Sequence, residues 1–193
     1  FHPLFVPTYF ILYLIKVVPF EFVGITDWQL QLRVFSVFWL TAFFPAFAVF
    51  LLWRLKFSES IFLRTQKDRI IPYVIVMFFY WWMYYLSRNF SDQPIVLKYF
   101  YFGVFIASAI GLIVNNFIKV SLHGMGIGGM LASVVLVGLK YPINNIIWDI
   151  AILFIAGIVI SARMMVSDHT NKELTIGLGI GIITQTLAYF WVG

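Results

Sequence analysis

The polar stretch with the most chemically useful spacing begins at Arg163. Five residues separate Arg163 from His169, and three more separate His169 from Glu173. If this stretch is helical, His169 and Glu173 are four positions apart and share one face. The Glu173 carboxylate would then accept a hydrogen bond from one imidazole nitrogen and leave the other as a nucleophile or base. The planar guanidinium of Arg163 would suit a phosphate group.

A second histidine stands in a different polar stretch, which reads Lys119-Val-Ser121-Leu-His123-Gly124. This stretch leads into a glycine-rich segment that we expect to start a helix. The free backbone N–H groups at the start of a helix bind anions. We therefore expect the start of this helix, at Gly124, to contact a phosphate.

A third polar stretch contains Lys67 and Arg69, with Pro72 three residues further on. Together the three stretches supply two histidines, one serine and several cations. A phosphate ester or anhydride fits this combination better than any other common substrate.

The composition determines the kind of element that positions these side chains. Hydrophobic residues make up 62% of the 193 residues, and charged residues only 11%. A soluble domain is roughly 45–50% apolar and about 25% charged, so this chain has too little polar surface for a water-soluble globule. The composition excludes an ordinary cytosolic enzyme, a disordered chain and a nucleic-acid-binding module. It predicts an all-α, polytopic transmembrane helical bundle.

The apolar runs predict about seven membrane-spanning helices, since each crossing needs about 20 residues. The expected spans are Leu4–Phe20, Val34–Trp53, Ile70–Leu86, Tyr99–Ile118, Gly124–Leu139, Ile143–Ala162 and Leu174–Val192. Small-xxx-small spacing also occurs twice, at Gly124 with Gly128 and at Gly177 with Gly181. This spacing indicates close packing between helices.

The order of the spans places the three polar stretches on one side of the membrane. Successive stretches are separated by two spans each, and two crossings return the chain to the face from which it started. The predicted active-site loops therefore lie on the same face as the N-terminus. Asp149 is expected near the opposite face of the membrane, and so away from the predicted site.

These stretches resemble the motifs of the type-2 phosphatidic acid phosphatase superfamily. The third motif of that family is Ser-Arg, five residues, His, three residues, Asp, which is similar to Ser161-Ala-Arg163 with His169 and Glu173. The second motif, Pro-Ser-Gly-His, resembles Val120-Ser121-Leu122-His123, and the first, Lys, six residues, Arg-Pro, survives as Arg69 with Pro72. The topology resembles the glucose-6-phosphatase branch. The resemblance covers about residues 64–173 and implies that residues 1–193 form a single integral membrane phosphatase-like domain.

The resemblance implies a role for each residue of the site. His169 would attack phosphorus and carry a phosphohistidine, Glu173 would orient His169, and His123 would protonate the leaving group. The phosphoryl oxygens would be held by Arg163, Arg69 and Ser121, helped by Lys67 or Lys119. No metal and no other cofactor is implied. Candidate substrates are phosphatidic acid, phosphatidylglycerol phosphate, polyprenyl diphosphate and lipid A phosphate.

The sequence also departs from the family pattern. Glu173 replaces an aspartate, Val120 and Leu122 replace the proline and glycine of the second motif, and Phe62 stands where the first-motif lysine is expected. These departures leave open a catalytically silent member that binds lipid or a partner membrane protein. A small transporter or channel subunit and an enzyme that transfers phosphoryl groups between lipids are further alternatives.

Charge and resemblance favour opposite orientations in the membrane. Eight Lys and Arg residues belong to the side of the site and four to the other side, so the positive-inside rule favours a cytoplasmic site. The family resemblance implies a site that faces the periplasm or a lumen. Because phosphate binding would itself hold several of these cations in place, we expect a bacterial inner membrane protein with the site facing the periplasm.

Overall fold

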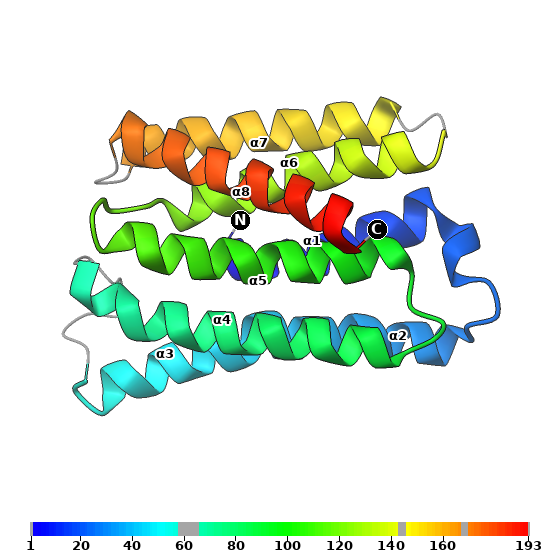
Figure 1. Ribbon diagram of the computed structural model, residues 1–193, viewed down its shortest axis with the longest axis horizontal. Helices are drawn as coiled ribbons and strands as arrows, with labels where there is room; N and C mark the ends of the chain where they lie inside the picture. Colours follow the sequence, from blue (N-terminus) through cyan, green and yellow to red (C-terminus); the bar gives the residue numbers. More distant parts are fainter. Residues whose placement is uncertain (1, 58–65, 143–145, 167–169, 193) are drawn as a thin grey trace.

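A computed structural model describes residues 2–57, 66–142, 146–166 and 170–192 of the chain (Figure 1). Every regular element in these ranges is a helix, which confirms the all-α prediction. The elements are η1 (Pro3–Phe5), α1 (Val6–Val17), η2 (Pro19–Phe22), α2 (Asp27–Phe38), η3 (Trp39–Phe43), α3 (Phe44–Arg54), α4 (Gln66–Asn89), α5 (Ile95–Asn115), α6 (Leu122–Lys140), α7 (Ile146–Val166) and α8 (Asn171–Val192).

The chain is a polytopic membrane protein. Six helices in the described ranges are long and apolar enough to cross a membrane. They are Asp27–Arg54, which joins α2, η3 and α3, and then Gln66–Asn89, Ile95–Asn115, Leu122–Lys140, Ile146–Met165 and Asn171–Val192. The first predicted span is instead a shorter apolar helix, Pro3–Val17, because Pro19 disfavours helical backbone at Val18.

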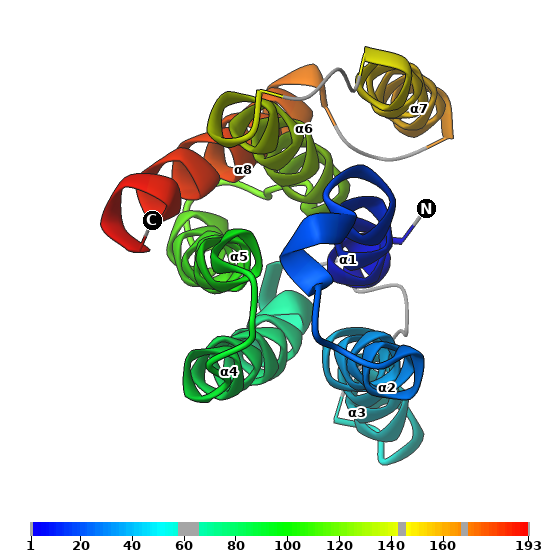
Figure 2. The ribbon, with the colours of Figure 1, turned by 90° about the vertical axis from the view of Figure 1, so that its right-hand side faces the viewer.

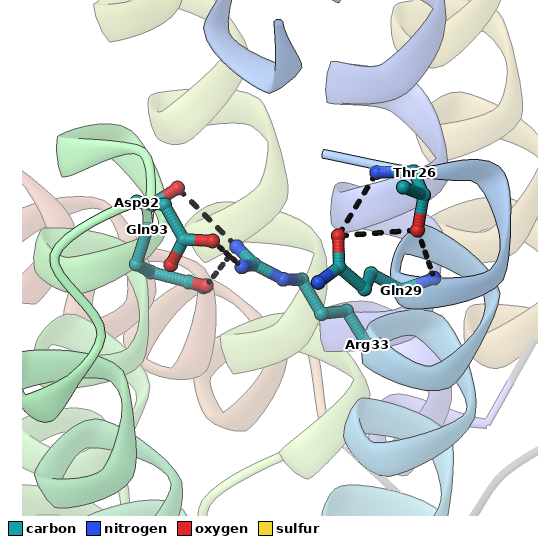
Figure 3. Close-up of polar contacts among 5 residues, drawn as sticks. All are labelled: Thr26, Gln29, Arg33, Asp92 and Gln93. Atoms are coloured by element: carbon teal, nitrogen blue, oxygen red, sulfur yellow. Dashed lines mark hydrogen bonds and ion pairs between the residues drawn. The ribbon is translucent and has the colours of Figure 1, made fainter. Parts of the chain in front are cut away.

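The second span begins earlier than its apolar run suggested. Thr26 caps the helix: its side chain accepts a hydrogen bond from the Gln29 N–H, and the Gln29 side chain accepts one from the Thr26 N–H (Figure 3). This capping box satisfies two backbone donors that the start of a helix would otherwise leave without partners. The helix therefore starts at Asp27, seven residues before the predicted start at Val34.

The centre of the bundle is held by glycines that bring α6 and α8 into backbone contact. A Cβ atom added at Gly128 would lie 2.2 Å from the carbonyl oxygen of Leu178, and one added at Gly181 would lie 2.2 Å from that of Met125. Gly124 and Gly177 face the opposite helix in the same way. This contact confirms the helix packing predicted from the small-xxx-small spacing.

The remaining helices surround this pair. Along the bundle, α5 packs against α8 on one side and α4 on the other (Figures 1 and 2). The first helix, α1, packs its Phe10 ring on Phe100 of α5, with 4.0 Å between the ring centroids. Figure 2 shows α7 at the edge of the bundle, beside α6.

One end of the bundle is held together by polar contacts between segments far apart in sequence. Arg33 of α2 forms an ion pair with Asp92 and donates to the Gln93 side chain at 3.1 Å (Figure 3). Nearby, the Tyr141 hydroxyl donates to Glu21 at 2.6 Å. We call this the far end, because the three polar stretches lie at the other end.

Candidate functional site

The three polar stretches meet at one end of the bundle. Figure 1 places the start of α4, the connection between α5 and α6, the end of α7 and the start of α8 at the same end of the structure. Backbone and side-chain contacts join these segments, as described below. The predicted common face is therefore confirmed for the described residues. The same end also receives the N-terminal segment.

Arg69 links α4 to the stretch that precedes α6. Its side chain is only 8% exposed, and its Nη1 atom donates to the carbonyl oxygen of Val120 at 3.0 Å. The Glu173 carboxylate attracts the Arg69 guanidinium, and the Arg163 guanidinium repels it. A buried guanidinium is costly unless hydrogen bonds and opposite charge compensate it. Arg69 thus brings a cation to the point where α4, α6 and α8 begin.

Ser121 connects the starts of α6 and α8. It is the N-cap of α6, where its Oγ atom accepts a hydrogen bond from the Gly124 N–H at 3.3 Å. Its backbone N–H donates to the carbonyl oxygen of Glu173 at 3.3 Å. The Gly124 N–H, which we expected to face a phosphate, is therefore engaged by Ser121, and an added Cβ at Gly124 would lie 2.6 Å from the carbonyl oxygen of Leu174. His123 lies in the first turn of α6 and is half-buried.

Glu173 lies in the first turn of α8 and takes part in its cap. Thr170 and Glu173 form reciprocal hydrogen bonds of 3.3 Å, with the Thr170 N–H donating to Glu173 Oε2 and the Glu173 N–H donating to Thr170 Oγ1. We expected one helix to contain both His169 and Glu173. The helix α8 begins at Asn171, so it includes Glu173 and does not include Thr170. His169 itself lies outside the described residues. Arg163 is half-buried in the last turn of α7.

The two lysines of the predicted site are less closely placed. Lys67 is exposed and Lys119 is half-buried. Within the described parts of the chain, no hydrogen bond or ion pair joins either lysine to Arg69, Ser121 or Glu173. The same parts hold no group of three or more His, Asp or Glu side chains placed for a metal ion.

His2 is a site residue that the sequence did not point to. Its ring meets that of His123 edge-on, with 5.8 Å between the centroids and an angle of 74°. Its Nδ1 atom accepts a hydrogen bond from the Leu4 N–H at 3.3 Å, so a neutral His2 carries its proton on Nε2. No local pattern marks this residue, because only the folding of α1 against α6 brings the two histidines together.

The environment of His2 predicts a pH effect on stability. Partial burial and the positive charge of Arg163 hold the pKa of His2 below its ordinary value of 6.5. In the window below 6.5 the unfolded chain therefore binds more protons at this position than the folded protein, and folding stability falls as the pH falls. We expect His2→Gln to lose this part of the pH dependence. Thermal unfolding of both proteins from about pH 7 to about pH 5 measures it, and equal slopes would contradict the prediction.

Two cavities begin beside this cluster. One, which we call the α7 groove, has a volume of about 390 Å³, lies between α1, α6 and α7, and has His2 and His123 among its lining residues. The other, the inner cavity, has a volume of about 290 Å³, lies between α1, α3, α4, α5, α6 and α8, and has His2 and Arg69 among its lining residues. Both are lined mostly by apolar side chains.

The chemistry available at this end of the bundle suits an anionic ligand. Arg69 and Arg163 supply two guanidinium groups, and His123 supplies an imidazole, whose two ring nitrogens can donate and accept hydrogen bonds. Apolar cavities begin at the same place, so a ligand with a hydrocarbon part would find room beside the cations.

The chain matches no model of a known protein family, no curated protein and no solved structure.

Proposed function

We propose that this protein is a metal-independent, membrane-embedded phosphatase. It hydrolyses a lipid phosphate or diphosphate through a phosphohistidine formed on His169. The observation that supports the proposal most is the meeting of Arg69, Ser121 and Glu173 at one end of an apolar bundle, joined by the Arg69–Val120 and Ser121–Glu173 hydrogen bonds. The three come from three different polar stretches of the sequence.

In the proposed reaction, a nitrogen of His169 forms a bond to phosphorus while the bond to the leaving oxygen breaks. His123 donates a proton to that oxygen, which leaves as the lipid alcohol or lipid monophosphate. Water then attacks the phosphohistidine, releases inorganic phosphate and restores His169. Glu173 orients His169. Arg163, Arg69 and Ser121 hold the phosphoryl oxygens, whose charge grows in the transition state.

The cavities support a lipid rather than a soluble phosphate ester as the substrate. The α7 groove reaches from His123 to Lys16, with apolar side chains of three helices along it. A hydrocarbon chain would lie in the groove while its phosphate meets the cations at the end of the bundle. These apolar walls would contribute nothing to the binding of a small soluble phosphate ester.

The test is release of inorganic phosphate by the detergent-purified protein from a panel of lipid phosphates and diphosphates, with a metal chelator present. Release from one lipid class would support the proposal and name the substrate. An Arg163→Ala preparation controls for contaminating phosphatases. Its rate should fall about a hundredfold because one donor to the phosphoryl oxygens is lost.

Phosphate release measured on sealed membrane vesicles tests our proposal that the site faces the periplasm of a bacterial inner membrane. Release from substrate added outside right-side-out vesicles supports that placement, and release only from inside-out vesicles contradicts it. If folded protein binds these lipids and releases no phosphate from any of them, the phosphatase proposal is wrong. The silent lipid-binding alternative then takes its place.

A further inference from the structure

The α7 groove and the inner cavity lie on the two sides of one contact between α1 and α6. Four residues line both of them, namely His2, Pro3, Val6 and Gly126. A Cβ atom added at Gly126 of α6 would lie 3.2 Å from Cγ2 of Val6 and 3.3 Å from Cβ of Pro3. The wall between the two cavities is therefore a single layer of side chains that rests on a glycine of α6.

Different helices complete the two cavities. Figure 2 shows α7 on one side of the α1–α6 pair, and α4 and α5 on the other side. The α7 groove takes its remaining lining from α7, and the inner cavity takes most of its remaining lining from α4, α5 and α8. The cavities are thus neighbours that share only the wall that η1, α1 and α6 form.

Both cavities run from the end of the bundle that holds the site toward the far end. In the inner cavity, Arg69 and Tyr80 of α4 are eleven residues apart, which is about 16 Å along the helix. In the α7 groove, Trp148 and Val159 of α7 are also eleven residues apart, and Val159 is the one nearer the site. The two cavities therefore offer parallel apolar paths of similar length.

Polar side chains stand where the two paths begin. Arg69 lines the inner cavity, and His123 lines the α7 groove. His2 lines both cavities and is exposed. Its Nδ1 atom accepts the hydrogen bond from the Leu4 N–H, so its Nε2–H remains as a donor. One phosphate group at this end of the wall would meet these side chains and have an apolar path on each side.

The polar groups deeper in the inner cavity do not call for a polar ligand. Most of them already donate hydrogen bonds to protein atoms: Tyr73 to Met125 Sδ, Ser108 to the carbonyl oxygen of Val104, Thr184 to that of Ile180 and Gln185 to that of Phe100. The Oε1 atom of Gln185 is buried against α5, where a ligand in the cavity does not reach it. Tyr80, whose hydroxyl is the exception, stands at the deep end, where the apolar path stops. The path between Arg69 and Tyr80 therefore suits a hydrocarbon chain.

From this arrangement we infer that the inner cavity binds the second hydrocarbon chain of a lipid whose first chain lies in the α7 groove. One two-chain lipid phosphate then lies across the α1–α6 wall, with its phosphate beside His2, Arg69 and His123. The inference rests on the proposed phosphatase for the head group, and it narrows the candidate substrates by the number of their chains. A polyprenyl diphosphate has a single chain and would leave one cavity without the dispersion contacts that a chain supplies. Lipid A phosphate carries more chains than two cavities hold.

The volumes fit one chain in each cavity. They are about 390 Å³ for the α7 groove and about 290 Å³ for the inner cavity, near the lower limit of the roughly 300–1,000 Å³ of pockets that hold a whole small ligand. Water is a poorer occupant, because a buried water needs two to four polar partners and most of the lining is apolar. A hydrocarbon chain needs none.

The first test uses a synthetic two-chain lipid phosphate that carries a photoreactive group near the end of each chain. Illumination of the protein with this lipid, in nanodiscs of phosphatidylcholine, should join a peptide of α4 around Tyr80 to a peptide of α7 around Trp148 through one lipid molecule. Mass spectrometry of the digested protein identifies the joined peptides, and an excess of unmodified two-chain lipid phosphate should abolish them. Attachment of both groups to one helix, or labelling that the unmodified lipid does not reduce, would overturn the inference. This test does not depend on phosphate release, so it can succeed where the phosphatase proposal fails.

A substitution in α4 tests the second chain separately. Val76 lines the inner cavity between Arg69 and Tyr80, and Val76→Phe would obstruct that path. We expect kcat/KM for phosphate release to fall about tenfold with a two-chain lipid phosphate and to stay the same with a single-chain one, which needs only the α7 groove. Val74→Phe is the matched control, since Val74 is exposed on the same helix and lines neither cavity.

Equal effects of Val76→Phe on the two substrates would overturn the inference, because the inner cavity would then not distinguish them. If that variant does not fold, or if the unmodified protein releases no phosphate from any lipid, the cross-linking experiment on the unmodified protein decides.

Discussion

Replacing His169 with alanine should abolish phosphate release, with a loss of at least about a thousandfold, because the nucleophile is gone.

Replacing His123 with alanine should have a different signature. Its proposed role is to protonate the leaving oxygen, a contribution of about 10²–10⁴-fold. A nitrophenyl phosphate has a leaving group that needs no proton, so His123→Ala should slow its hydrolysis much less than that of a lipid phosphate. The ratio of the two rates measures the role of His123 separately from any effect on folding.

A trapping experiment distinguishes the two histidines further. Rapid quenching of His123→Ala with labelled nitrophenyl phosphate should leave acid-labile phosphate on the protein, and His169→Ala should carry none. Lys172→Ala is the matched control, since Lys172 is exposed near the start of α8 and has no role in the proposed site. Unchanged turnover in His169→Ala would remove the phosphohistidine mechanism and the proposal that depends on it.

Gly181→Ala should destabilise the protein by about 3 kcal/mol, the upper part of the range for overpacking a tight interior. The added Cβ would lie 2.2 Å from the Met125 carbonyl oxygen and 2.6 Å from the Gly129 backbone nitrogen. Both are backbone atoms, which no side-chain rotation can move away, so α6 and α8 must separate. That separation would also pull Ser121 from Glu173, whose hydrogen bond joins the same two helices at the site.

Gly179→Ala provides the matched control on the same helix. An added Cβ at Gly179 meets no atom within 4 Å, so the change should stabilise the helix by about 0.5–1 kcal/mol. Thermal unfolding of the two variants in the same detergent should therefore shift in opposite directions. Equal shifts would show that the close approach of α6 and α8 does not determine stability.

The sequence could predict the parts of this structure that depend on composition, span order and local spacing. Long apolar runs predicted the helices, and the order of the spans predicted that Arg69, Ser121 and Glu173 would share one end of the bundle. The glycine spacing predicted the contact between α6 and α8. Each of these follows from a repeated or counted pattern, which needs no knowledge of how the helices pack laterally.

The parts that could not be predicted depend on contacts between segments distant in sequence. His2 joins the site only because α1 packs beside α6, and nothing around His2 in the sequence indicates that neighbour. Gln185 stands in an apolar run, and the cavity beside it arises from several helices together. The Thr170–Glu173 cap starts α8 at Asn171, whereas the sequence spacing suggested a helix that began before Thr170.

The peripheral position of α7 makes the thickness of the bilayer part of the geometry of the site. Arg163 lies in the last turn of α7, and a groove of about 390 Å³ lies between that helix and its neighbours α1 and α6. Protein packing therefore constrains the tilt of α7 less than that of α8, and membrane helices tilt to match the hydrocarbon around them. In a thinner or thicker membrane Arg163 would change height relative to Ser121 and Glu173, which the α6–α8 contact holds in place. Lipid composition would then tune how well the Arg163 guanidinium meets an anion held at the end of the bundle.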